Sequence, residues 1–199
     1  NDVDNYVWAL SQNLLWRIDP FTNIVVSQTA VVGAFSMDFD RNTGYVYVST
    51  SSGVDIYNLG VLLSSISVVG GAFHLAFNEF EGSMYVGGSS NNLLKINPTT
   101  FVTTVFTIPG LTTDPILYDS MSEATYAWGS SNLYKVDAGV VTSITSVVSG
   151  SSNWLSLNVL QSGVNVSNDT PEFSLVDVSD SYVYQQSYAN IWGIQSLNL

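Results

Sequence analysis

The sequence contains no cysteine and only four lysine and arginine residues. Without cysteine, the chain has no disulfide bonds, iron–sulfur clusters or thiol nucleophiles. Sixteen aspartate and glutamate residues oppose the four cations, and the formal net charge at pH 7 is −12. We therefore expect no nucleic-acid partner and no attachment to an anionic membrane, because both need a basic surface. No apolar run approaches the roughly 18 residues of a membrane-spanning helix, so membrane insertion is not expected.

Strong helix formers such as glutamate and lysine are also scarce, whereas β-branched and aromatic residues are abundant. Hydrophobic residues make up 46% of the 199 residues and charged residues only 10%, which excludes a disordered chain. Short alternating runs such as Tyr45–Val48 and Thr103–Ile108 are separated by glycine, asparagine, serine and proline. This pattern predicts an all-β protein. The chain starts at Asn1 without a methionine, so we expect a processed product or a piece of a longer protein.

One short pattern recurs four times: an aromatic residue or leucine followed by aspartate or asparagine. Its apolar positions 39, 77, 118 and 157 are separated by 38, 41 and 39 residues. In the first three copies a turn and then a tyrosine-rich strand follow. The copies are Met37–Asp40, Leu75–Asn78, Ile116–Asp119 and Leu155–Asn158.

Two further strands complete each unit. The third strand ends in aspartate or asparagine, which precedes proline in two copies and starts a turn through a local side-chain hydrogen bond. A fourth strand rich in valine, threonine and serine follows. The third-strand copies are Leu15–Pro20, Ile56–Leu59, Leu94–Pro98 and Tyr134–Ala138. Four strands in about 40 residues are typical of a β-propeller blade.

The segment Met84–Thr100, followed by Phe101–Gly110, resembles the YVTN-type propeller repeat, which is related in pattern to NHL-like blades. The resemblance covers residues 6–159 well and 182–196 weakly, and it implies a propeller of the kind found in surface-layer and other secreted proteins. Because a lone blade leaves both apolar faces in water, neighbouring blades must stack. We expect three complete blades from Phe35 to about Ser146 and two partial ones. Residues 1–199 then form about five units of one domain, as a small ring or part of a larger one.

Residues 161–181 interrupt the repeat between the first and second strands of the last unit. Such an insertion either carries specific contacts on one face of the disc or is a loosely packed loop. Asn165-Val-Ser167 and Asn168-Asp-Thr170 both match the N-glycosylation pattern and lie in this insertion. These acceptors favour a secreted protein from a glycosylating organism.

His74 is the only histidine, and it lies on a first strand, the position that lines the central channel of a propeller. It has either a structural role or the role of metal ligand or general base, which would need partner groups. Asp38 and Asp40 form an Asp-x-Asp pair that we consider for Ca²⁺, with solvated edge charges as the alternative. A second acidic cluster comprises Asp114, Asp119 and Glu123.

Arg17, Lys95 and Lys135 share one repeat position. They form either a ring of cations for an anionic ligand or a set of long side chains that cover their own blade edges. The net charge of −12 favours the second interpretation. We consider one or two of the five tryptophans as a stacking platform for sugar rings, and Trp154 lies on a first strand.

The function expected from these features is that of a non-catalytic, extracellular binding or assembly module of a cell-surface layer, appendage or virion. Its partners would be other protein subunits or surface glycans, or further copies of the same chain. One alternative is a metal-dependent hydrolase or lyase whose channel site contains His74, Asp114 and Asn153. A second alternative is a propeller that binds sugars through tryptophan. No Gly-x-Ser-x-Gly nucleophile motif is present.

Overall fold

The computed structural model describes residues 6–11, 13–88, 90–111, 116–120, 122–129, 132–146, 154–158 and 163–167. For residues 144–146, 154–158 and 163–167 only the backbone is described. Every regular element in these ranges is a β-strand, which confirms the predicted all-β fold class. Within the same ranges, no helix is long and apolar enough to span a bilayer.

The strands of the described ranges form five antiparallel sheets, and each sheet is built from strands that are consecutive in the sequence. The first sheet contains β1 (Val7–Leu10), β2 (Leu14–Asp19) and β3 (Ile24–Ala30). The second contains β4 (Ala34–Phe39), β5 (Val46–Thr50), β6 (Gly53–Asn58) and β7 (Val61–Ser67). The third contains β8 (Ala72–Asn78), β9 (Ser83–Gly88), β10 (Asn92–Ile96) and β11 (Thr103–Thr107).

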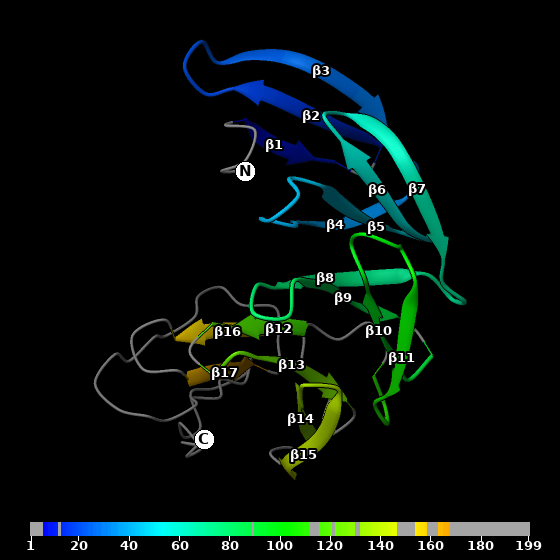
Figure 1. Cartoon of the computed structure of the whole chain (residues 1–199), viewed down its shortest axis with the longest axis vertical. Helices are drawn as coiled ribbons and strands as arrows, with labels where there is room; N and C mark the ends of the chain where they lie inside the picture. The colour runs from blue at the N-terminus through cyan, green and yellow to red at the C-terminus, as the bar shows by residue number, and fades with distance from the viewer. Residues whose placement is uncertain are drawn as a thin grey trace, which may run out of the picture.

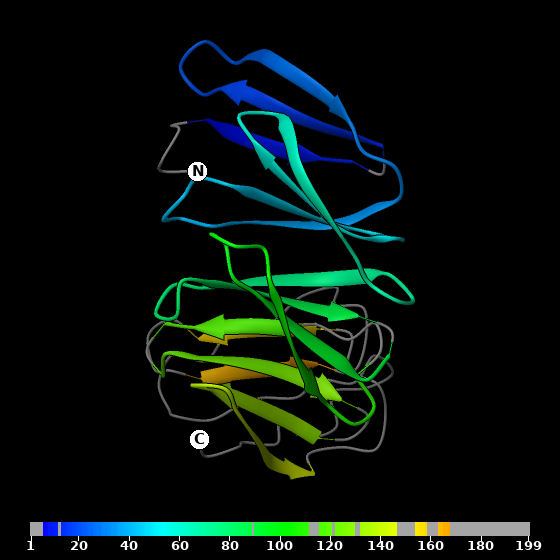
Figure 2. The same cartoon turned by 45° about the vertical axis from the view of Figure 1, so that its right-hand side comes forward.

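The fourth sheet contains β12 (Ile116–Asp119), β13 (Ala124–Gly129), β14 (Asn132–Asp137) and β15 (Val140–Ser146). The fifth contains β16 (Trp154–Asn158) and β17 (Gly163–Ser167). Among the described residues, three four-stranded sheets lie between a three-stranded first sheet and the two described strands of the last one, in agreement with the three complete units expected from the repeat. The sheets follow one another along an arc, with β4, β8, β12 and β16 on its concave side (Figure 1). Turned by 45°, they lie one upon the next along the long axis (Figure 2).

The second and third strands of each described sheet pair in the same register. In the first sheet Val7 lies opposite Ile18 and Trp8 lies opposite Arg17. The pairs equivalent to Val7–Ile18 are Val46–Tyr57, Met84–Ile96 and Thr125–Val136. Tyr47, Tyr85 and Tyr126 of the tyrosine-rich strands are therefore structurally equivalent, and Trp8 occupies the same position in the first sheet.

The hydrophobic core lies between the sheets rather than within any one of them. One cluster joins the first and second sheets, a second joins the second and third, and a third joins the third and fourth. Between the second and third sheets, for example, Tyr47 and Ile56 pack with Met84 and Val86. Stacking is thus what removes each sheet's apolar surface from water.

The structure differs from the sequence prediction in the last unit. Residues 163–167, inside the segment expected to be an inserted loop, form β17 and pair with β16. Val164 and Val166 alternate with polar residues there, and such alternation favours a strand beside the first strand of a blade. The second strand expected after residue 181 and the remainder of 161–181 lie outside the described residues.

Candidate binding surfaces

The carboxylates of Asp38 and Asp40 are engaged by backbone N–H groups. Asp40 is fully buried, and its carboxylate accepts hydrogen bonds from the backbone of Asn42 at 2.8 Å and of Thr43 at 3.2 Å. The Thr43 hydroxyl donates to the other oxygen at 2.6 Å. These bonds close the turn between β4 and β5.

Asp38 links two sheets. Its carboxylate accepts one hydrogen bond from the backbone of Phe39 at 2.8 Å and another from Phe77 in β8 at 2.7 Å. Burial between the sheets raises the pKa of Asp38 above its usual range, although the two N–H donors and Arg41 oppose the shift. Among the described residues, no group of three or more His, Asp or Glu side chains is arranged to hold a metal ion. Calcium binding at Asp38 and Asp40 stays a prediction.

The residues equivalent to Asp40 are Asn78 and Asp119, and both are fully buried at the same turn. The Asn78 side-chain oxygen accepts a hydrogen bond from the backbone of Glu81 at 2.9 Å, and the Asp119 carboxylate accepts one from the Ser122 hydroxyl at 2.6 Å. The Asn78 amide also donates to the Thr125 hydroxyl of the next sheet at 3.3 Å. The recurring aspartate or asparagine of the sequence repeat therefore holds the turns and the sheet stack.

The residues predicted for a channel site are only partly described. His74 lies in β8 opposite Gly87 and is half-buried, and β8 contacts β4 and β12 on the concave side of the arc. Trp154 begins β16, and Asn165 lies in β17. Asp114, Asn153 and Asn168 lie outside the described residues. The structure therefore does not bring His74, Asp114 and Asn153 together as one described site, and the two alternative functions stay predictions.

The three cations at one repeat position are each engaged within their own sheet. The Arg17 guanidinium stacks on the ring of Tyr6, with 3.6 Å between the guanidinium carbon and the ring centroid. The Lys95 ammonium lies 2.8 Å from the Glu81 carboxylate, and that of Lys135 lies 3.3 Å from the Asp137 carboxylate. These contacts support the interpretation that the cations cover their own blade edges.

A polar groove of about 700 Å³ lies between the third sheet and the turn that joins β14 to β15. Glu81, Lys95, Asn97 and Phe106 are among the side chains that line it. Besides its ion pair with Lys95, Glu81 accepts a hydrogen bond of 2.6 Å from the Tyr85 hydroxyl. Burial, followed by the hydrogen bond to Glu81 and then by the negative charge of Glu81, raises the pKa of Tyr85. Lys95 and Tyr85 therefore both contact the Glu81 carboxylate, which indicates a structural network.

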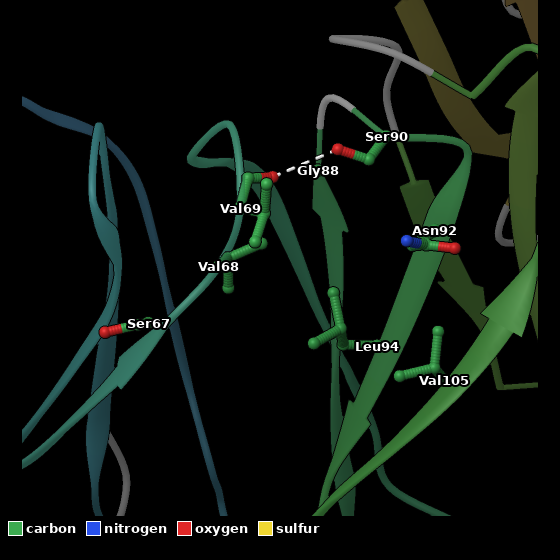
Figure 3. A pocket seen from close by; sticks show the side chains of 8 residues that line it. All are labelled: Ser67, Val68, Val69, Gly88, Ser90, Asn92, Leu94 and Val105. Carbon is green, nitrogen blue, oxygen red and sulfur yellow. Dashed lines mark hydrogen bonds between the residues drawn. The ribbon is translucent and has the colours of Figure 1, made fainter.

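A smaller, mostly apolar cleft of about 200 Å³ separates the end of β7 from β9, β10 and β11 (Figure 3). Val68 and Val69 line one side, and Leu94 and Val105 line the other. The Ser90 hydroxyl donates to the backbone oxygen of Val69 at 3.1 Å and crosses the mouth of the cleft. Apolar walls with few polar groups suit a protein side chain better than a charged ligand.

The outer strands of the first four sheets expose apolar side chains. We call these residues the outer rim, and their exposed fractions range from 44% to 66%. The rim residues are Ile24, Val25 and Val26 of β3, Val61, Leu62 and Leu63 of β7, Val105 of β11 and Val140 of β15. Single exposed apolar residues are ordinary, but a set repeated over neighbouring sheets is typical of an interaction surface.

Two of the rim strands, β3 and β7, carry bulges that hinder pairing with another strand. Strand β3 carries one extra residue, Val26, opposite the step from Arg17 to Ile18 of β2. Strand β7 likewise carries one extra residue, Leu63, opposite the step from Ile56 to Tyr57 of β6. Bulges of this kind twist an edge strand and interrupt its row of free backbone groups. At β3 and β7 a partner would therefore bind through side-chain packing rather than by adding a strand, whereas β11 pairs with β10 in an unbroken register.

An arc of stacked four-stranded antiparallel sheets with its inner strands on one side defines the chain as a β-propeller repeat protein. No known protein family and no curated protein matches the sequence. A solved structure that it resembles is the crystal structure of the Cps50 (Swd1) β-propeller domain of Myceliophteria thermophila, with a TM-score of 0.65. The two are 13% identical, so the likeness shows the fold alone. The match covers 80% of this chain and 57% of the length of that structure.

Proposed function

We propose that the chain is a non-catalytic β-propeller module that binds other protein subunits through the outer rim and serves assembly at a cell surface. The observation that carries the proposal is the exposure of isoleucine, valine and leucine along β3 and β7, together with Val105 of β11 and Val140 of β15. Burying such side chains against a partner removes apolar surface from water, which is the main driving force of protein association.

The charge distribution supports a protein partner. Lys95 and Lys135 are paired with acids, and the Arg17 guanidinium stacks on Tyr6. A net charge of −12 disfavours polyanionic ligands, whereas an uncharged rim strand can approach a partner at low electrostatic cost. The small cleft beside Val105 would extend the rim contact with space for a partner's side chain.

The cell-surface assignment rests on the sequence. Lysine is scarce, serine, threonine and asparagine are abundant, and the segment from Met84 to Gly110 resembles repeats of surface-layer and secreted propellers. Two N-glycosylation motifs at Asn165 and Asn168 point in the same direction.

The test measures how much of the purified wild-type chain, a rim variant and a control variant is retained on cell envelopes of the organism that encodes the protein. The rim variant carries Val61→Asp and Val105→Asp, and the matched control carries Val32→Asp, which is exposed but lies outside the rim. We expect wild type and control to be retained equally and the rim variant roughly tenfold less, with unchanged circular dichroism. Equal retention of the rim variant, or no retention of wild type, would overturn the proposal.

A further inference from the structure

The polar groove beside the third sheet opens at a place that side chains fill in the preceding sheet interface. Between the second and third sheets, the rings of Tyr45 and Phe101 pack there, with their centroids 6.2 Å apart. Between the third and fourth sheets, Ser83 has the place of Tyr45 in the repeat. The turn that carries Phe101 is replaced there by the shorter turn of Ala138 and Gly139. The groove therefore lies where two aromatic rings pack one interface earlier.

Glu81 brings an unused hydrogen-bond acceptor to this groove. Its side chain is only 9% exposed and lines the groove. Its carboxylate contacts the Lys95 ammonium at 2.8 Å and the Tyr85 hydroxyl at 2.6 Å, and both contacts use the oxygen Oε2. The other oxygen, Oε1, has no hydrogen-bond partner in the part of the chain that the structure describes. Because a poorly hydrated carboxylate oxygen is stabilised by a donor, the groove favours a ligand that donates a hydrogen bond.

The groove also has an aromatic wall. Phe106 is half-buried and lines the groove, and its ring stacks on that of Tyr85, with 6.3 Å between the centroids and 22° between the planes. Ser83, Asn97 and Thr104 add hydroxyl and amide groups to the lining. An aromatic ring beside a few polar groups suits a ligand that has an apolar C–H face and hydroxyl groups at its edge.

The charges of the lining favour a neutral ligand. Glu81 and Lys95 are the only charged residues among the described residues that line the groove, and their charges cancel. A cationic group at Oε1 would lie beside the Lys95 ammonium, and an anionic group would meet Glu81 in a chain of net charge −12. The volume of about 700 Å³ is within the range of roughly 300–1,000 Å³ that is usual for small-molecule sites.

We propose that the polar groove binds a neutral saccharide ring. Phe106 packs against the C–H face of the sugar, Glu81 Oε1 accepts a hydrogen bond from one hydroxyl group, and the Lys95 ammonium donates to a neighbouring sugar oxygen. None of the groove residues belongs to the outer rim. The inference goes beyond the proposed function, which concerns protein subunits, and gives the chain a second kind of ligand at a separate place.

The experiment titrates the 199-residue chain with the methyl glycosides of glucose, galactose, mannose and N-acetylglucosamine and detects binding by saturation-transfer NMR. We expect at least one glycoside to bind, with a dissociation constant of tens of millimolar or tighter. Ala138→Phe returns an aromatic ring to the groove and should weaken binding about tenfold or more. Leu59→Phe is the matched control, because Leu59 and Gly60 form the corresponding turn of the second sheet, with φ values of 50° and 89° against 46° and 82° at Ala138 and Gly139. It should bind as wild type does.

A second measurement needs no substitution that could impair folding. During the titration of wild type, the ring resonances of Phe106 should shift with the same dissociation constant. Those of Phe21, which is 87% exposed in the turn between β2 and β3, should stay unchanged.

Several results would overturn the inference. One is that none of the four glycosides binds. Another is binding that Ala138→Phe leaves unaltered, which would place the sugar elsewhere, for example on a tryptophan. A third is tighter binding of methyl glucuronide than of methyl glucoside, which would show that the groove selects a negative charge.

The inference and the proposed function fail separately. If Ala138→Phe loses glycoside binding but keeps envelope retention, both the saccharide site and the rim proposal stand. If the rim variant is retained on envelopes as well as wild type, the rim proposal is lost and the saccharide site is unaffected.

Discussion

Single residues at one repeat position have different surroundings, and the two buried tyrosines Tyr47 and Tyr85 illustrate this. Both are fully buried, and burial raises the pKa of both hydroxyls. The Tyr85 hydroxyl donates to Glu81, whereas the Tyr47 hydroxyl has no hydrogen-bond partner among the described residues. A buried polar group without a partner lowers stability, and a bond to a charged acceptor raises it.

We therefore expect Tyr47→Phe and Tyr85→Phe to change stability in opposite directions. Tyr47→Phe should raise the free energy of unfolding by about 1 kcal/mol, because it removes an unsatisfied buried hydroxyl. Tyr85→Phe should lower it by about 1.5–3 kcal/mol, because Glu81 loses a donor. Urea unfolding of the two variants beside wild type measures both values. Equal losses in the two variants would contradict this assignment of the hydroxyl contacts.

Asp38 makes stability depend on pH in a direction set by its burial. Its pKa in the folded chain is raised above the ordinary value of 3.8 because the carboxyl is buried between two sheets. The folded state therefore holds the proton more tightly than the unfolded state. The contribution of this group to the free energy of unfolding is fully present below pH 3.8 and is lost as pH rises through the folded pKa.

The difference between wild type and Asp38→Asn isolates this effect. The variant cannot titrate at position 38. Its NH2 group faces one of the two backbone N–H groups that donate to the carboxylate in wild type, so one hydrogen bond is lost at every pH. From pH 3.5 to pH 7 we expect wild type to lose stability relative to the variant. Denaturant unfolding at several pH values measures it, and a difference that is constant with pH would show that Asp38 has an ordinary pKa.

At the residue scale, the sequence predicts contacts within a turn but not contacts between sheets. Asp19 and Asn97 precede proline and were expected to start turns through their side chains. Their side-chain oxygens indeed accept backbone hydrogen bonds from residues two and three positions later, at 2.8 and 3.2 Å for Asp19 and 2.9 and 3.0 Å for Asn97. By contrast, the bond from Phe77 to Asp38 joins two blades and depends on how they stack.

Among the elements, the hairpin between β5 and β6 depends on a glycine that no other residue can replace. Gly53 has a φ of +149°, and a Cβ there would overlap the carbonyl oxygen of Ile66 and lie 2.9 Å from the backbone nitrogen of Val68. Gly139 in the turn between β14 and β15 also has a positive φ, +82°, but a Cβ there would meet no atom within 4 Å. A comparison of the two positions therefore separates the cost of backbone strain, which both share, from the cost of steric overlap, which only Gly53 has.

Alanine at these two positions should therefore have unequal costs. Gly53→Ala should lower the free energy of unfolding by about 3 kcal/mol or more, because strain and overlap add. Gly139→Ala should lower it by about 1 kcal/mol, because only the left-handed backbone opposes the new side chain. Thermal and urea unfolding report both, and similar costs would mean that the strand β7 can move away from Gly53.

The strand order could be read from the sequence because alternation and turn residues are local signals. The pairing register of β1 with β2, β5 with β6 and β9 with β10 follows the aligned tyrosine-rich and third-strand motifs. The strand β17 was missed because its five residues lie in a segment whose repeat pattern is absent. The bulges at Val26 and Leu63 were not predictable either, since an extra residue in an edge strand leaves no distinct composition.

For the whole molecule, the excess of acidic groups opposes compactness. The formal net charge is −12, and the ion pairs in the described part of the chain are Arg41–Glu79, Lys95–Glu81 and Lys135–Asp137. Most carboxylates therefore repel one another across the surface. Salt screens charges separated by more than about 10 Å at 0.1 M, which weakens this repulsion more than it weakens close ion pairs.

We expect the thermal midpoint to rise by about 2–4 °C when sodium chloride is raised from about 20 to 200 mM. Sucrose at the same osmolality is the control for effects other than screening. A midpoint that falls with salt would mean that the local ion pairs outweigh the general repulsion.

The amino-acid sequence alone determined the β-strand content, the repeat length near 40 residues and the order of strands within each blade, because these depend on neighbours in the chain. Only the tertiary structure decided which of several equivalent residues are covered. Val7 and Val46 have the same place in the repeat, yet one is half exposed and the other fully buried. Burial is conferred by the blade that stacks on a residue, and that blade is remote in the sequence.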